Sequence, residues 1–272
     1  MRCELSCVRG GPALKYQNLS VDTTDGLVTV TMRRAARRNS LSWEHLAELR
    51  SAFETVAGSE ARGILLAAEG PVFCSGHDFN DMHSRDLEEM RELLASCAEF
   101  MQMLLEIPQP VVAQVQGPAI GAGCQLVASC DLAVAGRSAS FQTPGGQGGW
   151  FCHTPAVAVV RAIGRKRALE MLFTGDAVDP ETAVEWGLVN HVVADDSLAA
   201  ESLALLQRAT RGSRVSKAEG KKAFYRQADL DVAGAYELAS DVMATTSQSR
   251  DGRENISAFV EKRRADYGDR SS

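Results

Sequence analysis

The stretch that decides the fold is Gly117-Pro118-Ala119-Ile120-Gly121-Ala122-Gly123-Cys124-Gln125-Leu126-Val127-Ala128-Ser129-Cys130-Asp131. It follows the apolar run 111–115, which is typical of a buried strand. Three glycines then allow a tight turn, and an apolar segment compatible with a helix begins directly after them. Such a turn leaves unpaired backbone N–H groups directed at one point, and the helix dipole adds partial positive charge there. The pattern predicts either a site for an anion or a developing oxyanion, or a tight turn without a ligand.

The composition limits the classes of protein and partner. The chain has 272 residues, of which 45% are hydrophobic and 24% charged, as in an ordinary soluble globular protein. A net charge of −6 gives no reason to expect nucleic acid or an anionic membrane surface as a partner. No apolar run approaches the length needed to span a membrane. We therefore expect no nucleic-acid partner and no membrane span.

The cysteines and the N-terminal residues bear on the compartment. The seven cysteines contain no CxxC pair and no zinc-ligand spacing, which predicts free thiols in a reducing compartment and no metal site. Residues 1–14 lack the apolar core of a secretory signal. They are either an irregular start or the remnant of an organelle-targeting peptide. We predict a cytoplasmic location, with the mitochondrial matrix as the alternative.

Residues 16–32 carry the signal of a β-hairpin. Two apolar runs, 19–21 and 27–31, flank Asp25-Gly26, a pair typical of a tight turn between strands. The loop that follows holds four arginines and leads to Ser42, which can cap a helix over 43–57. These arginines are typical of a solvated loop, but arginine also suits the binding of phosphates.

A second loop of small residues follows the next predicted strand. Strand 63–68 is followed by loop 69–79, and an amphipathic helix over 84–106 then leads to strand 111–115. This order predicts two parallel strands, and ligands of such folds gather beyond the carboxyl ends of the strands. A dinucleotide-binding fold is excluded because Leu126 stands where its third glycine would be.

The remaining chain combines short strands, helices and one loose loop. Four glycines within 145–149 make loop 143–155 either mobile or able to approach another group closely. The predicted strands are 131–135, 139–142 and 188–193, and the predicted helices are 156–162, 165–173, 180–186 and 197–209. The region 213–265 has no strand signal and predicts about three helices.

The order of these motifs resembles the crotonase superfamily, which contains the enoyl-CoA hydratases and isomerases. The resemblance covers residues 16–265. It rests on seven matching segments: 38–41, 73–78, 110–113, 117–131, 165–175, 183–189 and 259–263. Details at 76–78, 123–131 and 168–175 resemble the enoyl-CoA hydratase domain-containing protein 3 group within it.

The resemblance implies an α/β fold, a spiral of ββα turns with a C-terminal helical trimerisation region, and a homotrimer or hexamer. We accordingly expect a disordered or irregular segment over 1–15, the spiral core over 16–210 and the helical oligomerisation region over 211–272. It also implies an acyl-CoA thioester as the ligand, with CoA as part of the substrate and no separate cofactor.

The resemblance further implies an oxyanion hole, a pair of N–H groups that bind the thioester carbonyl. By motif position these are the backbone N–H groups of Ser75 and Ala122. Two such donors stabilise an enolate oxygen more than a ground-state carbonyl, which lowers the barrier to reaction at the adjacent carbons. The arginine loop then becomes the expected wall for the CoA phosphates and adenine. The residues expected to contact CoA are Arg37, Arg38, Ser40, Gly76, His77, Asp78, Gly121 and Lys262.

Two positions depart from the hydratases of the superfamily, which use two glutamates. Gln125 stands at the first of these positions and Gly145 at the second. Adding water across a double bond needs a general base and a general acid near the reacting carbons. Glutamine can position a water but cannot take its proton, and glycine offers only backbone. The isomerases rely chiefly on the second glutamate, so Gly145 argues against ordinary isomerisation as well.

Other side chains are candidates for the missing proton transfer. His153 falls where some members of the superfamily carry a catalytic aspartate, and a histidine can act as base or acid. It is equally compatible with a capping or packing role at a helix start. His77 is expected to flank the CoA, and Cys152 is either a bystander thiol or a nucleophile. Gly145 also leaves room for a bound anion such as bicarbonate to act as base.

Two functions follow as hypotheses. The first is an enzyme of the hydratase/isomerase type that stabilises a thioester enolate, with Ser75, Ala122, Gln125 and His153 as its catalytic residues. The second is a catalytically silent acyl-CoA-binding or assembly protein, because both glutamates are replaced. Turnover of CoA esters distinguishes them.

Overall fold

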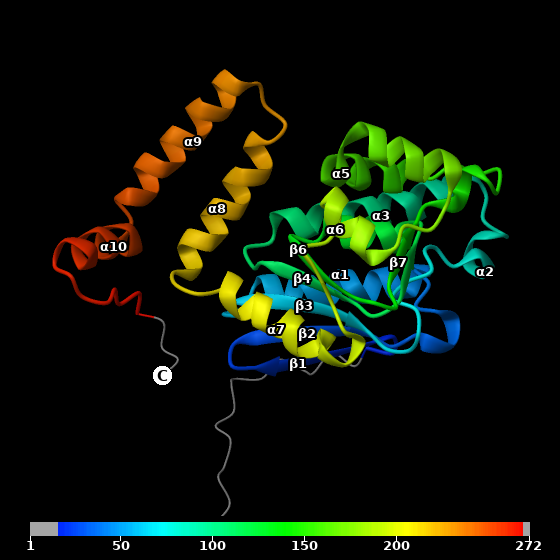
Figure 1. The fold of residues 1–272 in the computed structure, drawn as a ribbon, viewed down its shortest axis with the longest axis horizontal. Coiled ribbons are helices and arrows are strands. Elements are labelled where there is room, and N and C mark those ends of the chain that lie inside the picture. Colours follow the sequence, from blue (N-terminus) through cyan, green and yellow to red (C-terminus); the bar gives the residue numbers. More distant parts are fainter. Residues whose placement is uncertain (1–15, 269–272) are drawn as a thin grey trace, which may run out of the picture.

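The computed structural model describes residues 16–268, and its core is a six-stranded sheet (Figure 1). The strand order is β1-β2-β3-β4-β6-β8. Strands β1 (Leu19–Thr24) and β2 (Leu27–Met32) form the predicted hairpin around Asp25 and Gly26. All other neighbours pair in parallel, namely β3 (Gly63–Ala68), β4 (Val111–Val115), β6 (Leu132–Gly136) and β8 (His191–Val193). The predicted α/β class is confirmed.

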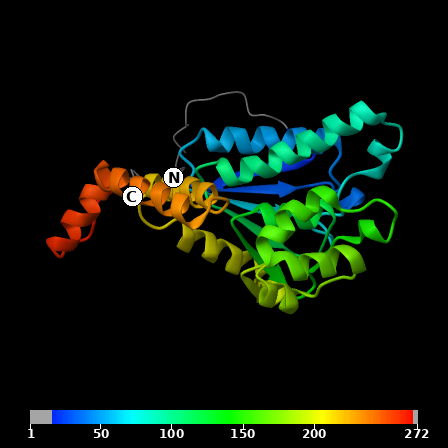
Figure 2. The same ribbon diagram turned by 90° about the horizontal axis from the view of Figure 1, so that it is seen from above.

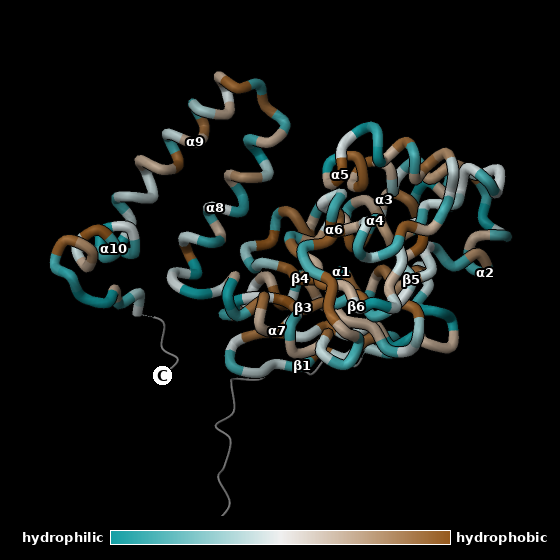
Figure 3. Tube along the Cα trace, in the orientation of Figure 1, coloured by the Kyte–Doolittle hydropathy of each residue, from teal (hydrophilic) through white to brown (hydrophobic). Residues whose placement is uncertain are grey.

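Helices cover both faces of this sheet. Helix α1 (Trp43–Ala57) begins at the predicted cap, where the Ser42 side chain accepts a hydrogen bond from the backbone N–H of His45. It packs against α3 (Leu87–Glu106) through an edge-to-face contact between Phe53 and Phe100. The opposite face is covered by α7 (Leu198–Ala209), whose Leu198 and Leu206 join the buried strand residues. Figure 3 shows hydrophobic chain segments gathered where β3 and β4 lie.

The long helix begins three residues later than predicted. Asp86 forms a capping box with Glu89, so α3 begins at Leu87, and a separate short helix α2 (Phe79–Met82) precedes it. In the capping box each side chain accepts a hydrogen bond from the backbone N–H of the other residue. Both N–H groups would otherwise lack a partner at the helix start, so the box fixes where α3 begins. Residues 83–86 therefore form a connection between two helices rather than the first turn of one.

The glycine-rich stretch also differs from the prediction in one respect. A short strand, β5 (Pro118–Ile120), lies between strand β4 and helix α4 (Ala122–Ser129), so the helix does not follow the first glycine directly. It pairs in parallel with β7 (Ser140–Gln142) in a separate two-stranded sheet. Gly121 is the N-cap of α4 with φ 57°, a backbone conformation that favours glycine. The sequence signal for β5 was too short to separate from the surrounding turn.

The second half of the chain is mainly helical. Helix α5 (His153–Thr174) is interrupted at Gly164, where φ is 76°, which matches the two consecutive helices that the sequence predicts. A turn leads into α6 (Pro180–Trp186), and short 3-10 turns precede α5 (Pro144–Gly146) and α7 (Asp195–Ser197). A third such turn, Ala35–Arg37, lies in the arginine loop.

The predicted C-terminal helices are α8 (Arg214–Gln227), α9 (Val232–Ser247) and α10 (Arg250–Val260). Asp131 anchors α8 to the core, because its carboxylate accepts hydrogen bonds from Lys221 Nζ (2.7 Å) and from the Tyr225 hydroxyl (2.8 Å). Helices α9 and α10 extend away from the core in both views (Figures 1 and 2). The domain boundary at residue 210 stays a prediction.

The structure bears on two other predictions. Cys74, Cys97, Cys124, Cys130 and Cys152 are free thiols, as predicted. Predictions for residues 1–15, which include Cys3 and Cys7, lie outside the described residues. Between residues 16 and 268, no helix combines the length and the apolarity needed to cross a membrane.

Candidate active site

Two loops from neighbouring strands meet in direct backbone contact. Cys74 forms an isolated parallel bridge with Ala119, and the backbone N–H of Ile120 donates to the carbonyl oxygen of Cys74 at 2.9 Å. Gly123 lies against the same carbonyl, where an added Cβ would approach to 2.1 Å. A Cβ on Gly76 would lie 2.8 Å from the carbonyl oxygen of Ile120 and 3.3 Å from the nitrogen of Ala122. The glycines are therefore required by close approach.

The structure corrects one half of the predicted oxyanion hole. The backbone N–H of Ser75 donates to the carbonyl oxygen of Arg38 at 3.0 Å, so it is not free to bind a ligand. Leu41 forms backbone hydrogen bonds to the two residues that flank His77. Its N–H donates to the carbonyl oxygen of Gly76, and its carbonyl oxygen accepts from the N–H of Asp78. Successive backbone groups of an extended chain point in opposite directions, so the N–H of His77 is directed away from Leu41.

Two backbone N–H groups consequently remain available. Within residues 16–268, neither the N–H of His77 nor that of Ala122 makes a hydrogen bond. Ala122 is the first residue of α4, where the backbone N–H has no partner within the helix. The geometry thus replaces Ser75 by His77 and retains Ala122.

These groups adjoin a cavity of about 570 Å³, called the proximal cavity below. It is lined by Ser75, Gly76, His77, Phe79, Leu94, Ile120, Gly121, Ala122, Pro144, Gly145, Gln147, Gly148, Trp150, Phe151, Cys152, His153, Thr154 and Pro155. The structure thereby brings together six of the twelve expected site residues, and also several side chains that the sequence did not single out. Phe79, Trp150 and Phe151 are the largest of them. The only available signal was an aromatic pair inside a glycine-rich loop.

Three side chains of the proximal cavity can exchange a proton. Burial lowers the pKa of His77 to about 4, against the opposing effect of Asp81, so its imidazole is neutral at neutral pH. Burial raises the pKa of the Cys152 thiol, while the backbone N–H of Gly145 opposes the rise. His153 is exposed at the start of α5, and its ring lies 5.1 Å from that of Phe151. No aspartate or glutamate is among the described residues that line this cavity.

Gly145 is closed in by its own loop. A Cβ at this position would lie 2.2 Å from the carbonyl oxygen of Trp150 and 2.8 Å from Cys152 Sγ. The first contact is with backbone, which cannot rotate away. A glutamate at position 145 is therefore incompatible with this loop conformation, and the thiol of Cys152 lies where such a side chain would begin.

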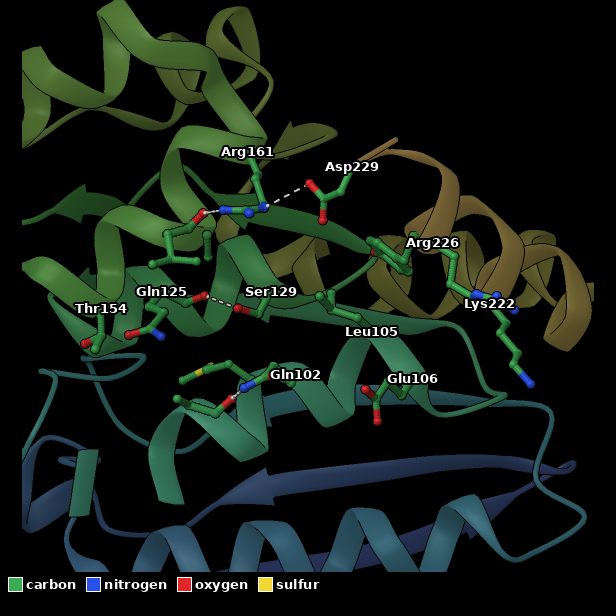
Figure 4. A pocket seen from close by; sticks show the side chains of 15 residues that line it. Gln102, Leu105, Glu106, Gln125, Ser129, Thr154, Arg161, Lys222, Arg226 and Asp229 are labelled. Atoms are coloured by element: carbon green, nitrogen blue, oxygen red, sulfur yellow. Dashed lines mark hydrogen bonds and ion pairs between the residues drawn. The ribbon is translucent and has the colours of Figure 1, made fainter. Parts of the chain in front are cut away.

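Gln125 is not among the residues that line the proximal cavity. It lines a neighbouring cavity of about 700 Å³, called the distal cavity below, between α3, α4, α5 and α8 (Figure 4). Its side chain is buried, and Oε1 has no hydrogen-bond partner in the described part of the chain. Thr154 lines both cavities, so they adjoin at this residue.

Two of the residues expected to contact CoA have structural partners instead. The Asp78 carboxylate accepts hydrogen bonds from Arg34 Nη2 (3.1 Å), Ser40 Oγ (3.0 Å) and the backbone N–H of Asn80 (3.1 Å). Burial alone would raise the pKa of the Asp78 carboxyl, but these hydrogen bonds and the charge of Arg34 together hold it below its usual value. Both Asp78 and Ser40 are buried. They fix the loop that carries His77, which explains the sequence pattern without a direct contact to a ligand.

The remaining CoA candidates are separated in space. Arg37 and Arg38 are exposed on the loop that precedes α1, as a phosphate-binding wall requires. Lys262 follows α10, at the opposite end of the molecule from α2 and the proximal cavity (Figures 1 and 2). Within one chain, the structure does not bring Lys262 to the site. No group of three or more potential metal-ligating side chains occurs in the part of the chain from Tyr16 to Gly268.

Fold and site together define a crotonase-type protein, an α/β scaffold with two opposed loop N–H groups beside a cavity and a C-terminal helical region. Comparison of the sequence supports this directly, because the family described as "Enoyl-CoA hydratase/isomerase" matches residues 22–270. The chain belongs to the enoyl-CoA hydratase/isomerase family.

Individual relatives and structures agree with this assignment. The chain is 43% identical over 258 residues to the rat protein "Enoyl-CoA hydratase domain-containing protein 3, mitochondrial". The aligned region covers 93% of this chain and 85% of that protein. The human protein of that name has a crystal structure with a TM-score of 0.88 at 39% identity, over 92% of this chain and all of that one. An enoyl-CoA hydratase structure from Mycobacterium smegmatis gives a TM-score of 0.89 at 43% identity, over 92% of this chain and 98% of that one.

The closure around Gly145 yields a stability prediction. Gly145→Ala is expected to lower the free energy of unfolding by about 1–3 kcal/mol, because the added methyl group overlaps the backbone of Trp150. Gly148→Ala in the same loop is the matched control, since its nearest contact is 3.8 Å away, and should change stability by less than about 0.5 kcal/mol. Urea denaturation measures both. Equal effects of the two substitutions would contradict the close approach.

Proposed function

We propose that the protein binds an acyl-CoA or enoyl-CoA thioester with its carbonyl oxygen between the backbone N–H groups of His77 and Ala122. The observation that carries the proposal is the pair of unbonded N–H groups on two loops held in contact beside the proximal cavity. Backbone donors held in this way need no reorganisation when charge develops on the oxygen. Losing one such donor typically costs on the order of 3 kcal/mol in transition-state stabilisation.

Chemistry at the α and β carbons of such a thioester passes through an enolate, which these donors stabilise more than the ground state. The proton transfer then needs a side chain, and the proximal cavity offers no carboxylate from the described residues. His153 is the proposed proton carrier, because its imidazole lines the proximal cavity and a ring nitrogen can accept or donate a proton. His77 is neutral there, and the Cys152 thiol is protonated. This differs from a hydratase that uses two glutamates.

A second candidate function is acyl-CoA binding without turnover. It is favoured by the position of Gln125 in the distal cavity and by the closure of the loop over Gly145. Both features leave the oxyanion hole intact while removing the usual acid and base. The two functions share a ligand and differ only in the chemical step.

The test combines binding with turnover. The wild-type protein is titrated calorimetrically with saturated acyl-CoA and then assayed with a panel of enoyl-, hydroxyacyl- and malonyl-type CoA esters. The enzyme hypothesis predicts turnover of at least one ester and a loss of about 100-fold in His153→Ala, the size typical of general acid–base catalysis. His83→Ala is the matched control, because His83 is an exposed histidine outside the proximal cavity.

The possible outcomes separate the hypotheses. Binding without turnover of any ester would support the silent binder. Turnover that survives His153→Ala would remove the role of that residue. Absence of binding to every ester would contradict both functions.

We also propose a homotrimer or a hexamer built through the C-terminal helices. Large apolar side chains on α9 and α10 are exposed in the single chain, including Tyr236 (72%), Met243 (77%) and Phe259 (85%). An apolar surface of this kind is typical of a protein–protein interface. Assembly would also explain Lys262, because a neighbouring copy could bring it to a site that its own chain does not reach.

The assembly proposal predicts the effect of charges on that surface. Tyr236→Asp together with Phe259→Asp is expected to reduce the molar mass from three or six chains to one, because the carboxylates would be buried in the interface. Leu87→Asp is the control. Leu87 is also a large apolar side chain and is 68% exposed, but it belongs to α3 and not to the C-terminal helices. Analytical ultracentrifugation gives the masses. A wild-type monomer, or an unchanged oligomer in the double variant, would contradict the proposal.

The relatives that carry the word "mitochondrial" in their names favour the mitochondrial matrix over the predicted cytoplasm as the compartment. We include this location in the proposal. Imaging of the full chain with a C-terminal fluorescent tag tests it, and a diffuse signal outside mitochondria would contradict it.

A further inference from the structure

The distal cavity adjoins the site at which the proposed thioester reacts. Gln125 follows Ala122 by three residues on α4, and Thr154 lines both cavities. A group that enters the proximal cavity with its carbonyl at Ala122 therefore has a second compartment of about 700 Å³ beside it. Figure 4 shows Gln125 and Thr154 close together at one end of the distal cavity.

The inner part of this cavity is mostly apolar. Its walls include Met101 and Leu105 from α3 and Val157 from α5. Gln102, Gln125, Ser129 and Thr154 are polar residues of the same lining, and Gln125 is only 4% exposed. The walls are suited to methylene groups.

The outer part carries an excess of positive charge. Arg161, Lys222 and Arg226 line it, against Glu106 and Asp229. Arg161 pairs with Asp229 at 3.7 Å (Figure 4). Lys222 and Arg226 make neither a salt bridge nor a side-chain hydrogen bond to any described residue. They lie four residues apart on α8, where like charges repel each other and an anion between them would relieve the repulsion.

The helix that carries these two cations is held firmly. Lys221 Nζ lies 2.7 Å from an Asp131 oxygen and also donates to the carbonyl oxygen of Gln109 at 2.9 Å. The Tyr225 hydroxyl donates to the other Asp131 oxygen at 2.8 Å. Lys221 and Tyr225 each directly precede one of the two cations in the chain. Their bonds to the core therefore fix the part of α8 that carries Lys222 and Arg226.

We propose that the distal cavity selects an acyl chain that ends in a carboxylate, with its methylene groups against the apolar walls and its terminal carboxylate at Lys222 and Arg226. The preferred substrate class is then an ω-carboxyacyl-CoA rather than a simple fatty acyl-CoA. This inference rests on the proposed function, since it assumes that the thioester binds at His77 and Ala122. Arginine suits the geometry of a carboxylate, and lysine adds a mobile second charge.

The experiment compares matched pairs of CoA esters by calorimetry on the full chain. Each pair consists of a saturated monocarboxylic acyl-CoA and the dicarboxylic acyl-CoA of the same length, with chains of six, ten and fourteen carbons. At least one dicarboxylic ester is expected to bind about three- to tenfold more tightly than its partner, and the preference should decline as salt screens the charges. The double variant Lys222→Gln/Arg226→Gln is expected to lose the preference while binding the monocarboxylic ester as the wild type does.

Lys217→Gln is the matched control, because Lys217 is an exposed cation of the same helix that does not line the distal cavity. It should leave the preference unchanged. Equal affinities within all three pairs, or a preference that persists in the double variant, would overturn the inference while leaving the proposed function intact. Failure of every ester to bind would overturn both.

Discussion

The backbone contact between residues 74–77 and residues 119–123 is the constraint on which the site depends. It holds the two loops at a separation that no side chain could tolerate, because Gly76 and Gly123 lie directly against carbonyl oxygens of the opposite loop. The same contact leaves the N–H groups of His77 and Ala122 without partners in the described structure. An unpaired donor is costly in a folded protein, so its retention at two adjoining positions is consistent with a ligand oxygen.

Much of the scaffold was predictable because its signals are local. The hairpin at Asp25-Gly26, the cap at Ser42 and the interruption at Gly164 each depend on a few neighbouring residues. The site was less predictable because its details depend on partners distant in the sequence. Only the fold shows that Arg38 occupies the N–H of Ser75, or that Asp78 is used by Arg34. Motif position alone could not distinguish Ser75 from His77.

The substitutions at the two glutamate positions have different physical consequences. Gln125 keeps a polar side chain that lines the distal cavity, and its oxygen is buried without a partner in the described structure. Gly145 permits the loop to fold over itself, which places the Cys152 thiol where an acidic side chain would start. Both positions therefore bear on the surroundings of the His77 and Ala122 N–H groups, which the proposed function uses as an oxyanion hole. Family membership does not depend on these two positions, because the family matches residues 22–270 as a whole.

The most direct test of this account is difference infrared spectroscopy of a saturated acyl-CoA with an isotope-labelled thioester carbonyl. Bound to the wild-type protein, the carbonyl stretch should move to lower frequency than in free acyl-CoA, because two N–H donors polarise the bond. Ala122→Pro removes one donor at the first helical position, where proline is tolerated, and should reverse most of the shift, while Ala122→Ser should retain it. A bound carbonyl with the frequency of the free ester would contradict the account.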